Sequence, residues 1–228
     1  MTRVPVLAYH SVSVDPHPLI ARFAVRPATF AAHLDLVVER GLEALTVDEL
    51  ARAFDAGDRA RLERAVAITF DDGFADVATQ AVPALAERGL PATLYVTTGL
   101  LRGGTAGPLD PGLGAHMLDW SDLAAARRAG VQIGAHTHSH PHLDTLGARR
   151  LREELTLPKA LLEDRLGAAV TSFAYPHGYG GPRVRRAVRD AGYLSACAVG
   201  QAFTAPDEDR LALSRLMPDH RTRPEEVA

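Results

Sequence analysis

The chain contains very little cysteine and lysine, with one residue of each, Cys197 and Lys159, among 228 residues. A single cysteine excludes an internal disulfide, so the fold does not need an oxidising compartment. Cys197 lies in an apolar run, which favours a buried, inert thiol over a nucleophile. The formal net charge is −3 and the arginines are scattered, so nothing in the charge indicates a nucleic-acid partner.

Long hydrophobic runs are also lacking. The apolar run at residues 4–9 is too short for the hydrophobic region of a signal peptide, and a turn-rich segment follows it. No stretch approaches the ~20 apolar residues that a membrane-spanning helix needs. From these observations we expect a cytoplasmic protein with no membrane span.

Short apolar runs alternate with longer amphipathic stretches along the chain, a pattern typical of β/α proteins. Hydrophobic residues make up 46% of the sequence and charged residues 23%, as expected for a globular chain that buries a full core. We find no repeat or linker, and therefore predict one α/β domain over residues 1–228, most simply a barrel. The expected strands are residues 4–9, 65–70, 92–97, 131–135, 171–175 and 193–199.

Helix signals occur between these strands. Thr46-Val47-Asp48-Glu49 has the form of a capping box, and Ser121 is expected to cap a helix that ends at Gly130. Residues 101–115 are rich in glycine and proline, which predicts a mobile surface loop. Further helices are expected at residues 27–40, from Gly73 to about residue 88, at 147–166 with an interruption before Pro158, and at 182–191.

Polar residues follow four of the expected strands at the point where each strand ends. They are His10, the pair Asp71-Asp72, the segment from His136 to His140, and Tyr175-Pro176-His177. In β/α barrels the active site lies at the carboxyl ends of the strands. We therefore expect these four segments to face one mouth of the barrel.

Two of these segments have the composition of a metal site. Adjacent carboxylates such as Asp71 and Asp72 repel each other unless a cation lies between them or one is protonated. Gly73 permits a sharp turn that would let both reach a common site, although one aspartate could instead cap the next helix. Among three nearby histidines, we favour His136 and His140 as ligands and leave His138 open, because an extended segment would point all three to one side.

Three motifs resemble those of the NodB-homology polysaccharide deacetylases. They are Thr-Phe-Asp-Asp-Gly at 69–73, Ile-Gly-Ala-His-Thr-His-Ser-His-Pro-His-Leu at 133–143, and Phe-Ala-Tyr-Pro-His-Gly at 173–178. The similarity extends over residues 4–217. It implies a distorted (β/α) barrel of about seven strands. It also implies a metal-dependent hydrolase that releases acetate from N-acetylhexosamine units of a glycan or glycoconjugate.

The resemblance also implies roles for individual residues. Asp72, His136 and His140 match the metal ligands of the family, and Asp71 matches its general base. Two imidazoles and one carboxylate suit Zn²⁺, with Co²⁺, Ni²⁺ or Fe²⁺ as alternatives. The third motif, Tyr175, Pro176 and His177, is expected to contribute to the oxyanion site or to line the sugar site.

The sequence departs from the commoner family pattern at two points. Ala174 occupies the position where many members have an arginine that orients the base, and Arg215 is a candidate to replace it as a buried charge. No Leu-x-His motif supplies the general acid near the C-terminus. Leu7-Ala8-Tyr9-His10, after the first strand, resembles the arrangement in the exopolysaccharide (poly-N-acetylglucosamine) deacetylase-like branch, whose acid histidine lies early in the chain. This resemblance implies His10 rather than His220 as the acid. Two other functions remain open: a metal-dependent esterase or amidase acting on another acylated small molecule, and a catalytically silent glycan-binding relative.

Overall fold

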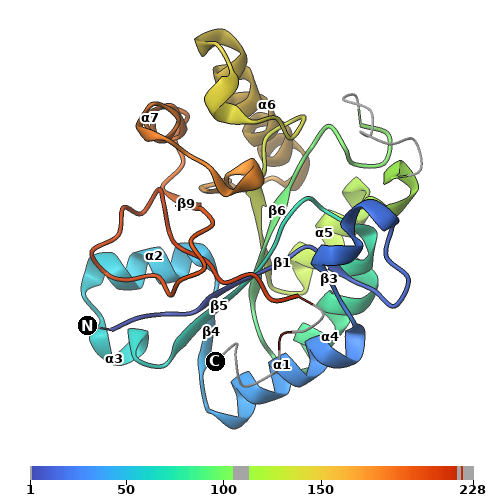
Figure 1. Ribbon diagram of the computed structural model, residues 1–228, viewed down its shortest axis with the longest axis vertical. Coiled ribbons are helices and arrows are strands. Elements are labelled where there is room, and N and C mark those ends of the chain that lie inside the picture. The colour runs from blue at the N-terminus through green and yellow to red at the C-terminus, as the bar shows by residue number, and fades with distance from the viewer. Residues whose placement is uncertain (1, 105–112, 220–221, 223–228) are drawn as a thin grey trace.

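A computed structural model describes residues 2–104, 113–219 and 222 of the chain. Its centre is a curled parallel sheet of seven strands, which has the order β1-β5-β6-β7-β8-β9 with β4 also paired to β5 (Figure 1). The curled sheet confirms the predicted barrel-like α/β fold. The strands are β1 (Val6–Tyr9), β4 (Glu43–Leu45), β5 (Ala65–Phe70), β6 (Ala92–Val96), β7 (Val131–Ala135), β8 (Ser172–Ala174) and β9 (Ser195–Cys197).

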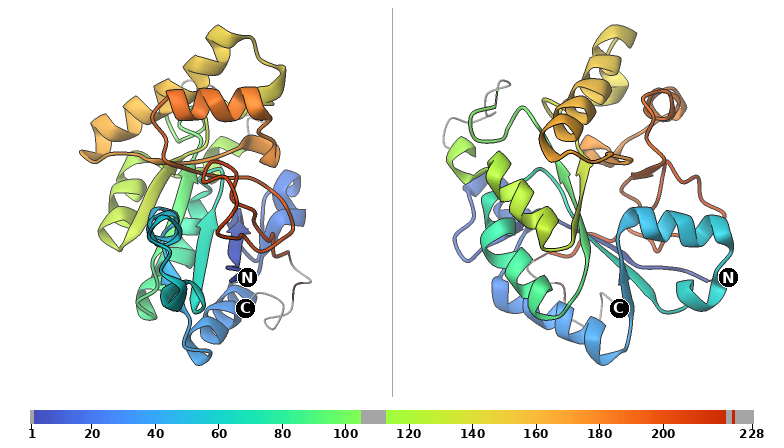
Figure 2. Two further views of the ribbon diagram at one scale, coloured as in Figure 1. Left: turned by 90° about the vertical axis from the view of Figure 1, so that its left-hand side faces the viewer. Right: turned by 180° about the vertical axis from the view of Figure 1, so that it is seen from behind.

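Helices surround the sheet on its outer side (Figures 1 and 2). The apolar residues of β5 alternate between two core clusters, with Val66, Ile68 and Phe70 in one and Ala65 and Ala67 in the other. The helices are α1 (Pro27–Glu39), α2 (Val47–Ala56), α3 (Arg59–Leu62), α4 (Val82–Glu87), α5 (Trp120–Arg128), α6 (Ala148–Leu166) and α7 (Pro182–Asp190). Within the described residues, none of them is long and apolar enough to cross a membrane.

One segment near the C-terminus connects the two edges of the curled sheet. Leu213 forms a parallel bridge with Cys197 of β9, and Leu216 forms a parallel bridge with Leu7 of β1. Leu216 exchanges backbone hydrogen bonds with β1, since its N–H donates to Val6 and its carbonyl accepts from Ala8. The segment therefore closes the barrel, and Arg215 lies between its two bridging residues.

Helix α2 packs across the amino-terminal ends of several strands. The N–H of Val47 donates to the Thr93 hydroxyl at 3.0 Å, and the Asp48 carboxylate accepts hydrogen bonds from Thr171 and Ser195. These partners stand at or next to the first residues of β6, β8 and β9. Because α2 covers this end, the opposite end, where the strands finish, is left for the functional site.

Several details of the expected elements need correction. Asp119, and not Ser121, caps α5, because its carboxylate accepts from the N–H groups of Ser121 and Asp122 in a capping box. Helix α6 runs through Pro158 without interruption, since Leu155 and Leu162 bury its apolar face on both sides of the proline. The helix expected after Gly73 is formed by a π-helix (Val77–Ala81) followed by α4. Most of the loop expected at residues 101–115 lies outside the described residues.

Candidate metal centre and its cavity

The turn after β5 separates the two aspartates. Asp72 has a φ of 70° and Gly73 a φ of 97°, so the backbone makes a left-handed turn directly after the strand. A non-glycine residue in this region is uncommon, and such strain is concentrated at functional sites. The carboxylates consequently face different partners, with Asp71 beside an arginine and Asp72 beside two histidines. The expected repulsion between them is offset by a separate cationic or imidazole partner for each.

Arg215 holds Asp71 at two points. Its Nη1 and Nη2 atoms lie 2.8 and 2.7 Å from the two carboxylate oxygens, and both side chains are buried. The guanidinium is itself fixed by hydrogen bonds to the Thr69 hydroxyl and the Ala198 carbonyl. Burial opposes ionisation of Asp71, but the charge of Arg215 is the main reason that the pKa of this carboxyl lies below its usual value. Asp71 is therefore an ionised carboxylate with a fixed orientation.

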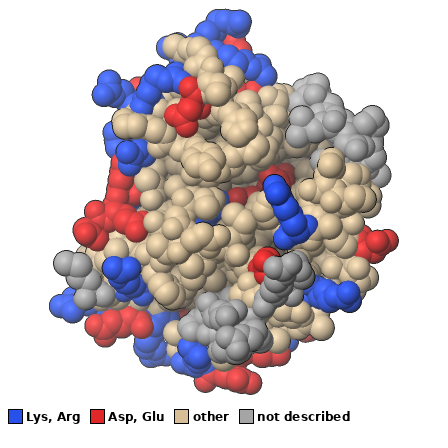
Figure 3. Space-filling view, viewed as in Figure 1, with Lys and Arg blue, Asp and Glu red and all other residues tan. Residues whose placement is uncertain are grey.

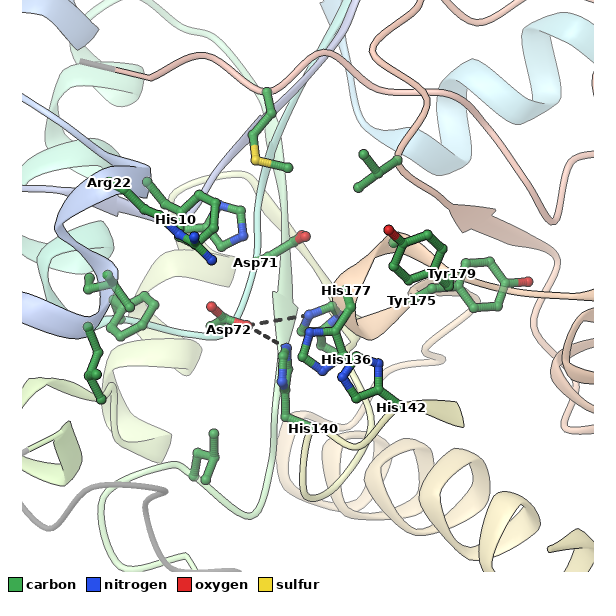
Figure 4. Close-up of a pocket in the computed structure, with 18 of the residues that line it drawn as sticks. His10, Arg22, Asp71, Asp72, His136, His140, His142, Tyr175, His177 and Tyr179 are labelled. Carbon is green, nitrogen blue, oxygen red and sulfur yellow. Dashed lines mark ion pairs between the residues drawn. The ribbon is translucent and has the colours of Figure 1, made fainter. Parts of the chain in front are cut away.

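Asp72, His136 and His140 form a set with the geometry of a metal site (Figure 4). One ligand atom from each lies within 4.8 Å of the others, and Oδ1 of Asp72 is 3.4 Å from Nε2 of His136 and 3.2 Å from Nε2 of His140. This Oδ1 atom is buried and accepts no hydrogen bond of good geometry from the residues that the structure describes. Burial raises the pKa of Asp72, yet the two imidazoles hold it well below its usual range.

The surroundings of His136 fit a metal ligand. Its Nδ1–H donates to the carbonyl oxygen of Ala174 at 2.8 Å, which leaves the lone pair of Nε2 directed toward Asp72. Metal-ligating histidines are commonly oriented by such a bond from the second ring nitrogen. An orphaned carboxylate oxygen and an oriented imidazole are what a divalent cation would satisfy, so the three residues fit a metal such as Zn²⁺.

The histidine segment does not follow the extended pattern that would align all three rings. Thr137 and His140 have φ values of 67° and 58°, and the Thr137 hydroxyl accepts from the N–H of His140. His138 lies outside the three-residue set, and its Nδ1 atom is 3.0 Å from the hydroxyl of Thr98. Among the described residues, the structure groups His136 and His140 with Asp72 and leaves His138 out of this group.

Glu154 supports this segment and was missed in the sequence analysis. Its side chain is fully buried, and its carboxylate accepts from the N–H groups of His138 and Ser139, each at 2.8 Å, and from the Ser139 hydroxyl. Arg150 completes the arrangement with a 2.7 Å ion pair. The sequence does indicate that Glu154 is buried, because this glutamate lies on the apolar face of an amphipathic helix, beside Leu151 and Leu155.

In the third motif, the Tyr175 hydroxyl is bonded within the core, whereas the His177 ring borders the cavity. The Tyr175 side chain is buried and its hydroxyl donates to the carbonyl of Leu211 at 2.7 Å, so the hydroxyl is occupied in the core. His177 has a φ of 59° and borders the cavity, where its ring stacks on His142 with 3.7 Å between centroids. Burial, followed by the neighbouring histidines, lowers the pKa of His177 to about 4.

His10 lies across the cavity from this motif, after β1 (Figure 4). Its ring stacks on Phe23 with 5.1 Å between centroids, and its buried Nδ1 atom has no hydrogen-bond partner among the described residues. Burial lowers the pKa of His10, and the two aspartates only partly oppose this. The alternative candidate, His220, lies outside the described residues.

These groups surround a cavity of about 510 Å³ at the carboxyl ends of the strands. Figure 3, in the orientation of Figure 1, shows the molecule hollowed near its centre, with acidic atoms inside the hollow and a cationic side chain at its edge. The polar base of the cavity is formed by the aspartates and histidines. The apolar lining is contributed by Leu19, Ile20, Phe23, Phe74, Leu100, Met117, Val199 and Met217.

Comparison with known proteins identifies the class of this site. The profile of the polysaccharide deacetylase family matches residues 58–196, which is more than half of the chain. YxkH from Bacillus subtilis (strain 168), a polysaccharide deacetylase by name, is 26% identical over 214 residues, covering 94% of this chain and 71% of YxkH. The chain therefore belongs to the polysaccharide deacetylase family, whose members are hydrolases that act on carbon–nitrogen bonds other than peptide bonds.

Two solved structures share the fold. The deacetylase PplD of Streptococcus pyogenes, solved in complex with acetate, has a TM-score of 0.87 and 23% identity, covering 98% of this chain and 96% of PplD. A de-N-acetylase from Aggregatibacter actinomycetemcomitans has a TM-score of 0.82 and 19% identity, covering 99% and 98% of the two chains. The curled sheet and its surrounding helices are thus the arrangement found in known deacetylases, and the predicted family resemblance is confirmed.

Proposed function

We propose that this protein is a metal-dependent N-deacetylase that hydrolyses the acetamide of N-acetylhexosamine units in a polysaccharide or glycoconjugate and releases acetate. The observation that carries the proposal is the pairing of a three-residue ligand set with an ionised carboxylate in one cavity. Asp72, His136 and His140 supply the ligands, and Asp71 supplies the base. The names of the two structural neighbours, one a de-N-acetylase and one bound to acetate, support the choice of an acetyl amide.

Zn²⁺ is the cation that this donor set suits best, with Co²⁺, Ni²⁺ and Fe²⁺ as alternatives. When bound, a divalent ion supplies Lewis acidity, which polarises the acetyl carbonyl and acidifies water. The carboxylate of Asp72 and the Nε2 atoms of His136 and His140 would hold it. Glu154 and the Ala174 carbonyl fix the loop and the imidazole on which those atoms depend.

Asp71 is the proposed general base. It is ionised, it borders the cavity, and Arg215 fixes the direction of its two oxygens. In the proposed reaction Asp71 accepts a proton from the water whose oxygen adds to the acetyl carbon. Arg215 takes the orienting role for which many family members use the position of Ala174, and it does so from the segment that closes the barrel.

The remaining steps concern the carbonyl oxygen and the leaving amine. The N–H of His177, in the turn after β8, is our candidate donor to the negative charge that develops on the carbonyl oxygen. As the carbon–nitrogen bond breaks, the sugar nitrogen must gain a proton, and we assign its delivery to His10 on the opposite wall. The products are acetate and a free amino sugar.

The test is acetate release from N-acetylglucosamine oligomers by protein that has been stripped of metal and then reloaded with Zn²⁺ or Co²⁺. We expect release only after reloading. Acetate release from an O-acetyl sugar but not from the amide would reassign the protein as an esterase. Stoichiometric metal binding and glycan binding without any acetate would indicate a silent relative.

A further inference from the structure

One guanidinium borders the cavity in the described part of the chain. Among the described lining residues, Arg22 is the one arginine or lysine, and it lies beside His10 on the wall formed by the 3₁₀ segment Pro18–Phe23 (Figure 4). The proposed deacetylation leaves this residue without a task, because the base, the acid and the metal ligands are all other side chains. A cation at the edge of a substrate cavity therefore needs a separate explanation.

Arg22 is held in place without a carboxylate. Its guanidinium lies over the Phe23 ring, 4.4 Å from the centroid, and Phe23 in turn stacks on His10. No ion pair joins Arg22 to any acidic group in the described part of the chain. Arg22 is an exposed residue, and this aromatic contact orients its guanidinium at the cavity, where no described residue accepts a hydrogen bond from its N–H groups.

The acidic groups of the cavity cannot serve as that ligand. Asp71 is neutralised by the two-point contact with Arg215, and Asp72 faces His136 and His140. These two aspartates are the acidic residues among the described residues that line the cavity. Neither aspartate therefore offsets the charge of Arg22, which has no anionic partner among the described residues. Charge complementarity therefore favours a substrate with a negative group.

We propose that the cavity binds an N-acetylated sugar that carries an anionic group, a phosphate or a carboxylate, and that Arg22 binds this group. Arginine presents its N–H donors in a fork that matches both oxyanions at two points. Arg22 is thus a specificity-determining residue, which selects among acetylated sugars by charge. This inference rests on the proposed function and narrows its substrate class.

Binding to the metal-stripped protein isolates the contribution of Arg22. Without metal, no cation on the ligand set attracts the anion directly, and the proposed reaction does not consume the sugar. Isothermal titration would compare N-acetylglucosamine with N-acetylglucosamine 6-phosphate and with N-acetylmuramic acid, which carries a carboxylate. We expect at least one anionic sugar to bind about tenfold more tightly than the neutral sugar, or better. Whether phosphate or carboxylate binds more tightly distinguishes the two chemistries.

Variants then test whether Arg22 causes the preference for the anionic sugar. R22A should remove the preference for the anionic sugar, R22K should keep part of it, and raised salt should weaken it. R128A is the matched control, since Arg128 is an exposed arginine at the end of α5 that does not border the cavity. Equal affinities for charged and neutral sugars, or a preference that persists in R22A, would overturn the inference. Failure of the proposed function looks different: the preference for anions remains, but no acetate is released after metal reloading.

Discussion

Arg215 and Asp71 form a two-point ion pair in which the side chains are 1% and 5% exposed. The two residues are 144 positions apart, and they meet because the segment carrying Arg215 closes the barrel between β9 and β1. The segment that closes the barrel therefore contacts the proposed catalytic base through this ion pair. In this chain the completion of the fold and the ionisation of Asp71 depend on each other.

Replacement of Arg215 by methionine should impair both stability and activity. Removing one partner of a buried pair leaves an uncompensated charge, which costs about 3–5 kcal/mol in the free energy of unfolding. Burial then raises the pKa of Asp71, so the acidic limb of the kcat/KM profile should move to higher pH. Urea unfolding and pH–rate profiles measure the two effects. The double variant D71N/R215M, which has no buried charge at this position, should regain much of the stability; equal losses in both variants would contradict the pairing argument.

Most of the residues of the site can be predicted from the sequence, but not all of the contacts between them. Position after a strand was enough to predict that Asp71, His136 and His177 border one cavity, because carboxyl ends of parallel strands meet at one edge. Arg215 was recognised as a candidate buried charge, but its pairing with Asp71 depends on chain closure, which no local pattern encodes. The alternating pattern of an extended segment would point His138 to the same side as His136 and His140. It does not apply here, because two residues of this loop adopt positive φ. Glu154 was missed because periodicity marks a helical face as buried without identifying what it contacts.

Loss of a proposed ligand should abolish metal binding without unfolding the protein. D72N and H140Q remove a donor from the three-residue set, so we expect the Kd for Zn²⁺ to rise by more than the roughly 10- to 100-fold typical of residues that only support ligands. Zn²⁺ should raise the melting temperature of the wild type, because it binds the native state, but not that of these variants. The matched control is H138Q, a change in the same loop outside the set.

D71N should keep its metal and lose turnover, because it removes the proposed base and leaves the three ligands in place. Retained activity would exclude Asp71 as the base.

Glu154→Gln should weaken metal binding although Glu154 touches no ligand atom. The glutamine keeps one carbonyl acceptor where the carboxylate accepts two N–H groups and a hydroxyl, so the loop that positions His136 and His140 loses support. We expect the affinity for Zn²⁺ to fall about 10- to 100-fold. Glu153→Gln makes the same chemical change one residue earlier, at a partly exposed side chain paired with Arg149. A similar loss of metal affinity in both variants would show that α6, and not this contact, is responsible.

His33 should make the fold less stable in acid. The ring is fully buried, with Nδ1 3.0 Å from the Tyr9 hydroxyl and Nε2 3.3 Å from the Thr222 carbonyl, so the neutral tautomer protonated on Nε2 satisfies both partners. Burial lowers the pKa of His33, and the Thr222 carbonyl only partly opposes this. The unfolded chain then binds the proton more readily, so stability is lost as pH falls below about 6.5, the pKa of a free histidine.

The measurement is urea unfolding at pH 7.5 and pH 5.5 for the wild type and for His33→Gln. Other histidines whose pKa is lowered, such as His10, titrate in the same direction, so the comparison concerns the difference between the two proteins. The variant should be less stable at pH 7.5, because it loses the contact with Tyr9, and should depend less on pH. An unchanged pH dependence would show that His33 stays neutral in both states or is protonated in both.

His10→Gln should separate the two halves of the proposed reaction. If His10 delivers the proton to the leaving nitrogen, the variant loses about 100-fold or more in kcat on an acetylated amino sugar, whose amine cannot leave unprotonated. Hydrolysis of 4-nitrophenyl acetate should fall much less, because the nitrophenolate leaves without a proton and the attack assisted by Asp71 is unaffected. His220→Gln is the matched control, since His220 is the alternative acid. Equal losses on amide and ester would instead assign His10 to the binding of the acyl group, and a selective loss in His220→Gln would transfer the role of acid to that residue.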